Sequence, residues 1–418
     1  MSTNHAGIIA RTALGLTAAA LVTFAGACSG QGRHTSQGTN LAQLRMAQIK
    51  SATEWDMANQ AYMSGDFRKA LRHVDSSIAM NNQVPRSHIL RGRILLEMGS
   101  LDTALLSFQT AEALDPINVD AHYFQGIIFE RVIKRDRALE KYMLAAELDP
   151  TSPQYAIAVA EVMVDLNRPE DAELYLDERG SQFEHNAGVK QTLAHLAMIQ
   201  GDTERAVDLF NQARLLAPDS QTIVEDLVRA QVETGRFAEA EFQLASLLER
   251  PENRDRRDLK HMRAHCLMQV DRPLDARALL IELTEGTAGQ SDVQAWIGLG
   301  TVAVQLRDFN RVRRASSRVQ ALAPSQPEGF LLQAIWQSRA DMPEEAVRST
   351  AEALRRDRTN LNALTLHAAL LTRLERYDLA LKTIEYARAI DPNNRGIAAV
   401  ALALSAKQDG GFASAPSD

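Results

Sequence analysis

The sequence has few of the residues that build β-sheets, disulfide frameworks or nucleic-acid interfaces. Aromatic residues make up only 5% of the 418 residues, and the chain has two cysteines, 22 glycines and 13 prolines. Two cysteines are too few for a disulfide framework. Asp and Glu (53) outnumber Lys and Arg (46), so the chain lacks the basic excess typical of proteins that bind nucleic acid. Stretches rich in Ala, Leu, Glu, Arg and Gln dominate instead, and they predict an all-α fold.

The first residues have the pattern of a bacterial export signal. An apolar run of about 13 residues, 12–24, is shorter than the roughly 20 residues that a membrane-spanning helix needs. Small residues at 25–27 precede Cys28, so we predict a signal peptide over residues 1–27. The residues before Cys28 resemble a lipobox, which implies lipidation of Cys28. The alternative is an ordinary signal-peptidase cut at the same bond, which would leave a soluble secreted protein.

A small residue recurs every 34 residues through most of the chain. Alanine holds this place at Ala70, Ala104, Ala138, Ala172, Ala206, Ala240, Ala276, Ala346 and Ala380. The period defines ten units between residues 51 and 394, with two extra residues at 255–256 and two at 291–292. The units are 51–84, 85–118, 119–152, 153–186, 187–220, 221–254, 257–290, 293–326, 327–360 and 361–394.

Each unit has the pattern of a helix hairpin. Apolar residues at unit positions 4, 7, 8 and 11 share one face of a first helix, and those at 17, 20, 24 and 27 share one face of a second helix. Glycine at position 15, as at Gly99 and Gly201, favours the left-handed turn that ends the first helix. Proline at position 32, as at Pro116 and Pro150, ends the second helix.

These residues resemble the tetratricopeptide repeat family over residues 51–394. The resemblance implies an all-α, right-handed α-α superhelix of about ten helix-turn-helix repeats, whose first helices line a concave groove. Outside the repeats we predict a flexible tether over 28–40 and a helical lead-in over 41–50. We further predict a capping helix over 395–408 and a disordered tail over 409–418.

The resemblance places unit positions 2, 5, 9, 12 and 13 on the groove. Many of these positions are apolar, which favours a docked peptide or protein, and the charged ones in the third to seventh units are mainly acidic. The expected ligand therefore has apolar anchors and some positive charge. The alternative for any single residue is packing against the next hairpin. Candidate ligand-binding residues are Trp55, Tyr62, Arg93, Leu96, Tyr123, Ile127, Arg131, Glu161, Asp165, Met198, Glu225 and Arg229, and the stripe continues at Ile297, Val304, Leu331 and Ile335.

No motif in the sequence indicates catalysis or a cofactor. The chain has no phosphate-binding loop, dinucleotide fingerprint, H-E-x-x-H or G-x-S-x-G motif, and the repeats leave no room for a catalytic domain. His261 and His265 share one helical face near Asp258 and Cys266, a spacing that can chelate a transition metal. We favour the alternative, an ordinary polar groove surface, because no third ligand is fixed by the spacing.

Together these features predict a non-enzymatic scaffold of the bacterial envelope that binds proteins or peptides and no nucleic acid. Cys28 would anchor it to a periplasm-facing membrane, and Ser29 after Cys28 favours the outer membrane where one exists. By analogy, it would support a pilus, a secretion system or exopolysaccharide export. The alternative is a soluble secreted module that binds carbohydrate or another polymer. Only Trp55, Tyr62 and Tyr123 offer rings for sugar stacking, all near one end, so we prefer the scaffold.

Overall fold

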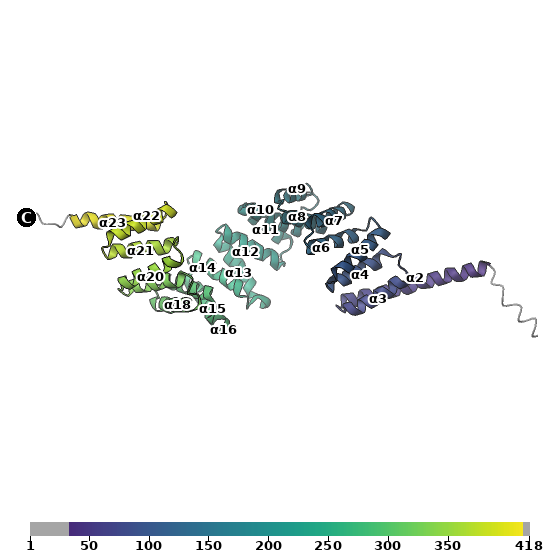
Figure 1. Ribbon diagram of the computed structural model, residues 1–418, viewed down its shortest axis with the longest axis horizontal. Helices are drawn as coiled ribbons and strands as arrows, with labels where there is room; N and C mark the ends of the chain where they lie inside the picture. Colours follow the sequence, from purple (N-terminus) through teal and green to yellow (C-terminus); the bar gives the residue numbers. More distant parts are fainter. Residues whose placement is uncertain (1–32, 413–418) are drawn as a thin grey trace, which may run out of the picture. The chain divides into compact units, whose positions relative to one another are not determined.

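The computed structural model describes residues 33–412, and every regular element in that range is a helix (Figure 1). The predicted signal peptide, Cys28 and residues 413–418 lie outside the described residues. None of the helices within 33–412 is long and apolar enough to cross a membrane. The chain divides into two compact units, residues 1–196 and 197–418, and the division falls inside α10 (Ala187–Ile199). The predicted all-α fold of helix hairpins is confirmed.

The first unit is a series of hairpins, and the second helix of each of its first three hairpins also packs against the first helix of the next one. Its pairs are α2 (Arg33–Met63) with α3 (Phe67–Met80), α4 (Pro85–Glu97) with α5 (Leu101–Leu114), α6 (Val119–Arg131) with α7 (Arg135–Leu148), and α8 (Pro153–Asp165) with α9 (Pro169–Asp177). The helices from α4 onward begin at the unit positions that the 34-residue period predicts, because each hairpin repeats the same start and stop residues.

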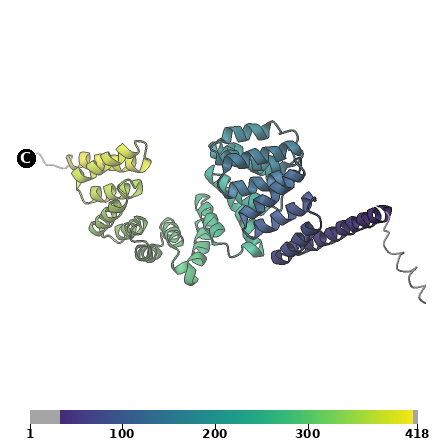
Figure 2. The ribbon, with the colours of Figure 1, turned by 45° about the vertical axis from the view of Figure 1, so that its right-hand side comes forward.

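The second unit continues the same pattern after α11 (Thr203–Leu216). Its pairs are α12 (Gln221–Glu233) with α13 (Phe237–Glu249), α14 (Arg257–Gln269) with α15 (Pro273–Thr284), α17 (Val293–Gln305) with α18 (Phe309–Leu322), α19 (Glu328–Arg339) with α20 (Pro343–Arg356), and α21 (Leu361–Arg373) with α22 (Tyr377–Ile390). The short helices η1 (Pro251–Asn253) and α16 (Gly286–Gln290) precede the two predicted insertions. The last helix, α23 (Arg395–Phe412), packs on α21 and α22 as a cap, and Figure 2 shows these last helices in yellow.

Two terminal boundaries differ from the prediction. Residues 33–40, predicted as part of the flexible tether, are helical because α2 begins at Arg33, and the lead-in is part of the same helix. Residues 409–412, predicted as tail, belong to α23. Lengthening an existing helix requires only propagation, and no proline interrupts either segment, so the chain continues helical beyond the last packed turn. In Figure 2 the purple N-terminal part of α2 projects past α3.

The turn inside every repeat holds one residue in the left-handed region. This residue is always at unit position 15, and its φ lies between 55° (Asp271) and 81° (Gly201). Four of the ten positions are glycine, as the sequence predicts for this turn. The other six carry a side chain at Ile133, Asn167, Asp271, Arg307, Asp341 and Glu375. A Cβ atom makes this conformation unfavourable, most of all for a β-branched residue such as Ile133.

Glycine at unit position 8 serves a second purpose, the close approach of a ring. A Cβ atom on Gly92 would lie 2.5 Å from the ring of Phe108, and one on Gly126 would lie 2.4 Å from the ring of Tyr142. Both rings are at unit position 24, are buried, and rest directly on the backbone of the first helix. An aromatic residue at position 24 therefore requires a glycine at position 8 in these two repeats.

The strained turn at Ile133 yields a first prediction. Ile133→Gly should stabilise the protein by about 1 kcal/mol, because relief of the left-handed strain exceeds the entropy that glycine adds to the unfolded chain. The isoleucine side chain is 70% exposed, so little packing is lost. The midpoint of urea unfolding measures the change. Asn167→Gly is the matched control and should gain less, since asparagine tolerates this conformation. A lower midpoint for Ile133→Gly would show that the turn is unstrained.

Candidate functional site

The first helices of the last three repeats line a pocket of about 670 Å³, a size typical of ligand-binding clefts. Its walls come from α17, α19 and α21 and the turn before α21, and most lining residues hold the unit positions that the sequence assigns to the groove. The apolar lining is Ile297, Val304, Leu331, Leu332, Ile335, Leu366 and Ala369, and the polar lining is Thr301, Gln305, Glu328, Asn360, Asn362 and Thr365. The structure thus brings the predicted residues Ile297, Val304, Leu331 and Ile335 together at one site.

In the first repeats, predicted groove residues contact one another. The indole nitrogen of Trp55 donates to the backbone oxygen of Arg86 at 3.3 Å, and the Arg86 guanidinium lies 4.6 Å from the indole centroid. The guanidinium of Arg93 lies 4.9 Å from the ring of Tyr62 and 5.4 Å from that of Phe124. Such cation–π contacts contribute about 0.5–1 kcal/mol each at exposed sites. These contacts link one first helix to the next, so the side chains stabilise the stack.

Tyr123 extends this cluster into the fourth repeat. Its ring centroid lies 5.5 Å from that of Phe124, 5.6 Å from that of Tyr142 and 5.2 Å from that of Tyr155. The hydroxyl of Tyr142 donates to Glu130 at 2.8 Å, and burial, followed by Glu130, raises its pKa. Edge and tilted ring contacts of this kind stabilise packing. Tyr123 is therefore surrounded by rings that belong to the chain itself.

Leu96, predicted to bind a ligand in the groove, is buried in the core instead. It is only 5% exposed and belongs to a buried cluster with Phe108 and Ile128, against which Ile127 also packs. Leu96 is at unit position 12, one helical turn beyond the buried position 8, so it shares the face that packs inward. Leu96 has too little exposed surface to contact a ligand, and Ile127 is half-buried in the same packing.

The remaining candidates in the first unit lie at its surface. Arg131, Glu161 and Asp165 are exposed, and Asp165 accepts a hydrogen bond from Arg135 at 3.2 Å. Although Glu161 is exposed as a residue, partial desolvation of its carboxyl group, followed by the nearby carboxylate of Glu130, raises its pKa. Some acidic character is therefore present here, as the sequence predicts. In the second unit, Met198 is half-buried in α10.

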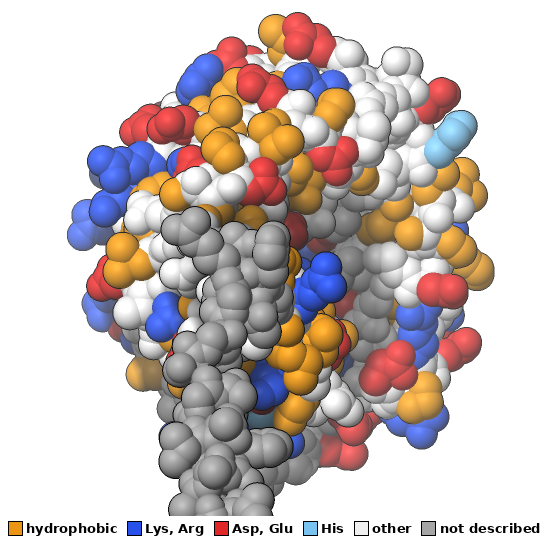
Figure 3. Space-filling model, turned by 90° about the vertical axis from the view of Figure 1, so that its right-hand side faces the viewer, with side chains coloured by type: hydrophobic (Ala, Val, Ile, Leu, Met, Phe, Trp, Pro, Cys, Tyr) orange, Lys and Arg blue, Asp and Glu red, His pale blue; other side chains and the backbone are white. Residues whose placement is uncertain are grey.

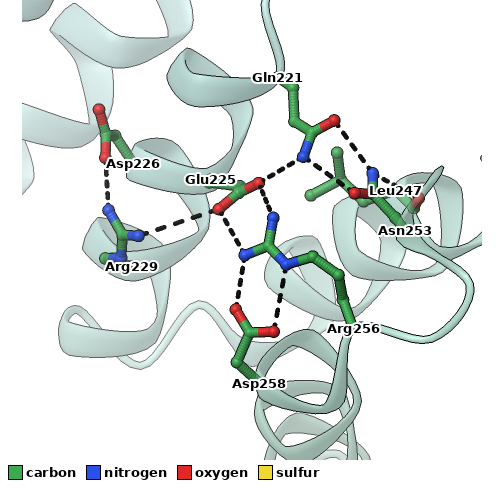
Figure 4. Close-up of polar contacts among 8 residues, drawn as sticks. All are labelled: Gln221, Glu225, Asp226, Arg229, Leu247, Asn253, Arg256 and Asp258. Atoms are coloured by element: carbon green, nitrogen blue, oxygen red, sulfur yellow. Dashed lines mark hydrogen bonds and ion pairs between the residues drawn. The ribbon is translucent and has the colours of Figure 1, made fainter.

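Glu225 in the second unit is already bonded to an arginine of the same chain (Figure 4). The guanidinium of Arg256 donates to both carboxylate oxygens, at 2.6 and 3.0 Å, and Gln221 donates at 2.7 Å. The hydrogen bond from Arg256 is the largest cause that holds the pKa of Glu225 below its usual value. Arg256 also bonds Asp258, whose pKa it lowers. Glu225 is therefore already bonded within the chain.

Arg229 is likewise bonded, to Asp226 at 2.6 Å. The acidic middle groove predicted from Glu225 and Asp258 therefore also contains Arg256, which bonds both carboxylates. That arginine is in the insertion 255–256, which has no position in the repeat pattern. The face in Figure 3 shows acidic and basic side chains intermixed, with no extended field of one charge among its described side chains.

The histidine pair does not form a metal site. The Nε2 atom of His261 is 2.8 Å from a carboxylate oxygen of Asp292, whereas His265 packs edge-on against the ring of Phe237, with centroids 5.6 Å apart. Cys266 is buried in the core, and burial raises its pKa to about 11. Among the described side chains no three His, Cys, Asp or Glu residues are placed to hold a metal ion. Each imidazole instead contacts a different neighbour.

Stacked helix hairpins with a pocket along their first helices define a class of α-helical repeat protein that binds other polypeptides. Models of the tetratricopeptide repeat family match residues 56–116, 89–155 and 197–260, and the same hairpin recurs through the rest of the described chain. The chain is thus a tetratricopeptide repeat protein. Such proteins are generally scaffolds without catalytic activity, and their repeats bind proteins or peptides.

The relatives and solved structures described next each match part of this chain. DnaJ homolog subfamily C member 7 of Homo sapiens is 26% identical over 202 residues, which cover 44% of this chain and 41% of that protein. The chain thus spans about two fifths of that relative. Among solved structures, the thermophilic tetratricopeptide repeat protein TTC0263 of Thermus thermophilus is 19% identical over 44% of this chain and 99% of its own, with a TM-score of 0.37. The P58(IPK) TPR domain is 17% identical over 86% and 99%, with a TM-score of 0.32.

The bonded arginine of Figure 4 yields a second prediction. Arg256→Ala should destabilise the second unit by roughly 1–2 kcal/mol at pH 7, because it leaves the poorly exposed Glu225 carboxylate without its main partner. The folded-state pKa of Glu225 is depressed, so its stabilisation is present above its unfolded pKa and is lost as pH falls through the folded value. The loss should therefore shrink toward acid pH in thermal unfolding. Arg254→Ala, at an exposed site, is the control. An equal loss at every pH would contradict the assignment.

Proposed function

We propose that this protein is a non-catalytic scaffold that docks a peptide or protein partner along the first helices α17, α19 and α21. The observation that carries the proposal is the pocket of about 670 Å³, which has seven apolar lining residues. Apolar side chains that line an open hollow are stabilised when a partner covers them. The aromatic groove residues of the first three repeats, Trp55, Tyr62 and Tyr123, contact other side chains of the protein, so they contribute to stacking of the repeats.

We further propose a place for this scaffold in the bacterial cell envelope. The support is in the sequence: an apolar run at 12–24, small residues at 25–27 and then Cys28. Lipidation of Cys28 would hold the repeats at a periplasm-facing membrane, the outer membrane where one exists. There they would assist assembly of a pilus, a secretion system or an exopolysaccharide export machine.

The alternative of a carbohydrate-binding module has less support. Sugar stacking needs an open aromatic face, but the rings of Trp55 and Tyr62 are each contacted by an arginine of the neighbouring repeat. Tyr123 is contacted by three other rings. The scaffold remains the function that the geometry supports best.

The docking pocket can be tested by site-specific crosslinking in the cells that make the protein. A benzoylphenylalanine at Thr301, an exposed residue in the wall of the pocket on α17, should yield discrete crosslinked polypeptides under ultraviolet light. The same probe at Ser317, which is exposed on the second helix α18, is the matched control and should yield few. Equal crosslinking at both positions, or none at Thr301, would argue against docking in this pocket.

The anchor has a separate test. Mass spectrometry of the mature protein should find a first residue at Cys28 that carries diacylglycerol, and Cys28→Ser should release the protein from the membrane fraction. Each buried methylene contributes about 0.8 kcal/mol, so several acyl chains are enough for stable attachment. An unmodified Cys28 would remove the anchor and leave the docking proposal untouched.

A further inference from the structure

One charged side chain lies inside the apolar pocket. Glu328, at the start of α19, is the single ionisable residue among those that line it. Its Oε2 atom is buried and has no hydrogen-bond partner within the protein. A buried carboxylate oxygen without a partner is unfavourable, most of all when the group is charged. Glu328 is thus a feature that the fold alone does not satisfy.

No lysine or arginine is among the residues that line the pocket, and four arginines of this repeat and the next have partners elsewhere. Arg356 is 3.0 Å from Glu352 and donates to the backbone oxygen of Pro324. Arg373 pairs with Asp341, and Arg376 pairs with Glu344 at 2.8 Å. Arg339 lies over the ring of Phe309. The cation that would satisfy Glu328 is therefore best supplied by a ligand.

We propose that this pocket takes a peptide segment in which aliphatic side chains lie next to a lysine or arginine, and that the basic side chain pairs with Glu328. This inference rests on the proposed docking function and names the chemistry of its partner. The aliphatic side chains cover Leu331, Ile335 and Leu366, while the cation pairs with the carboxylate group of Glu328, a half-buried residue of the pocket lining. Asn362, exposed in the pocket wall, offers amide groups to the peptide backbone.

Charge makes the pocket selective among apolar segments. An uncharged aliphatic segment would cover Glu328 and remove its remaining contact with water, and an acidic segment would add repulsion in a partly dry site. A basic segment converts the same carboxylate into a charge-assisted hydrogen bond. Discrimination between peptides therefore comes both from weaker binding of uncharged and acidic segments and from stronger binding of basic ones.

Selection from a random peptide library displayed on phage, with the full-length protein as bait, tests this inference. Enriched peptides should carry Lys or Arg close to Leu, Ile, Val or Met. A synthetic copy of an enriched peptide, titrated by fluorescence anisotropy, should bind the Glu328→Gln variant at least about tenfold more weakly, a difference of roughly 1.4 kcal/mol. Glu385→Gln, an exposed glutamate on the second helix α22, is the matched control and should bind as the parent does.

A peptide with norleucine in place of the basic residue completes a double-mutant cycle. It should bind the parent protein about as weakly as the original peptide binds Glu328→Gln, with little further loss when both changes are combined. If Glu328→Gln binds as tightly as the parent while Ile335→Glu abolishes binding, the charge pairing is wrong and the docking function stands. If Ile335→Glu has no effect, or no peptide is enriched, both are wrong. Circular dichroism confirms that each variant is folded.

Discussion

The close approach of the two helices in each repeat is the constraint on which the rest of the structure depends. The residue at unit position 20 is fully buried in all ten repeats; it is alanine in nine of them and Val312 in the eighth. With so small a side chain at the contact, a larger residue at position 24 can rest on the opposite helix, as Phe108 does on Gly92. Each hairpin is too thin to bury its apolar face alone, so stability comes from contact with the next one.

The 34-residue period predicts most of this architecture because apolar and small side chains recur at the same unit positions in most hairpins. Proline at unit position 17 even begins α9, α15 and α20, where the repeat pattern is weak. The left-handed turn at Ile133 was not predictable from its own residue type, since packing of the flanking helices imposes a conformation that isoleucine disfavours. The helical N-terminal part of α2 was not predictable either, because that extension makes no distinctive sequence pattern.

The candidate site was less predictable than the fold, because one stripe of first-helix positions has two uses. Trp55 and Arg86 hold such positions, yet they contact each other across 31 residues of sequence. Only the structure shows that pairing. Glu225 holds a groove position too, but its partner Arg256 belongs to an insertion that no repeat pattern places. The sequence therefore identified one stripe of first-helix positions and could not separate its paired members from its open ones.

Side-chain size and shape decide which use prevails. In the first repeats, long arginine side chains reach from one first helix to aromatic rings on the next. The side chains of the stripe therefore cover one another there. In α17 and α19 the same positions carry Ile297, Leu331 and Ile335, which have neither rings nor charges and line the pocket. Repeats built on the same helix hairpin therefore differ in the side chains of this stripe. A scaffold of this kind gains its binding site by leaving a few adjacent repeats without the residues that close the others.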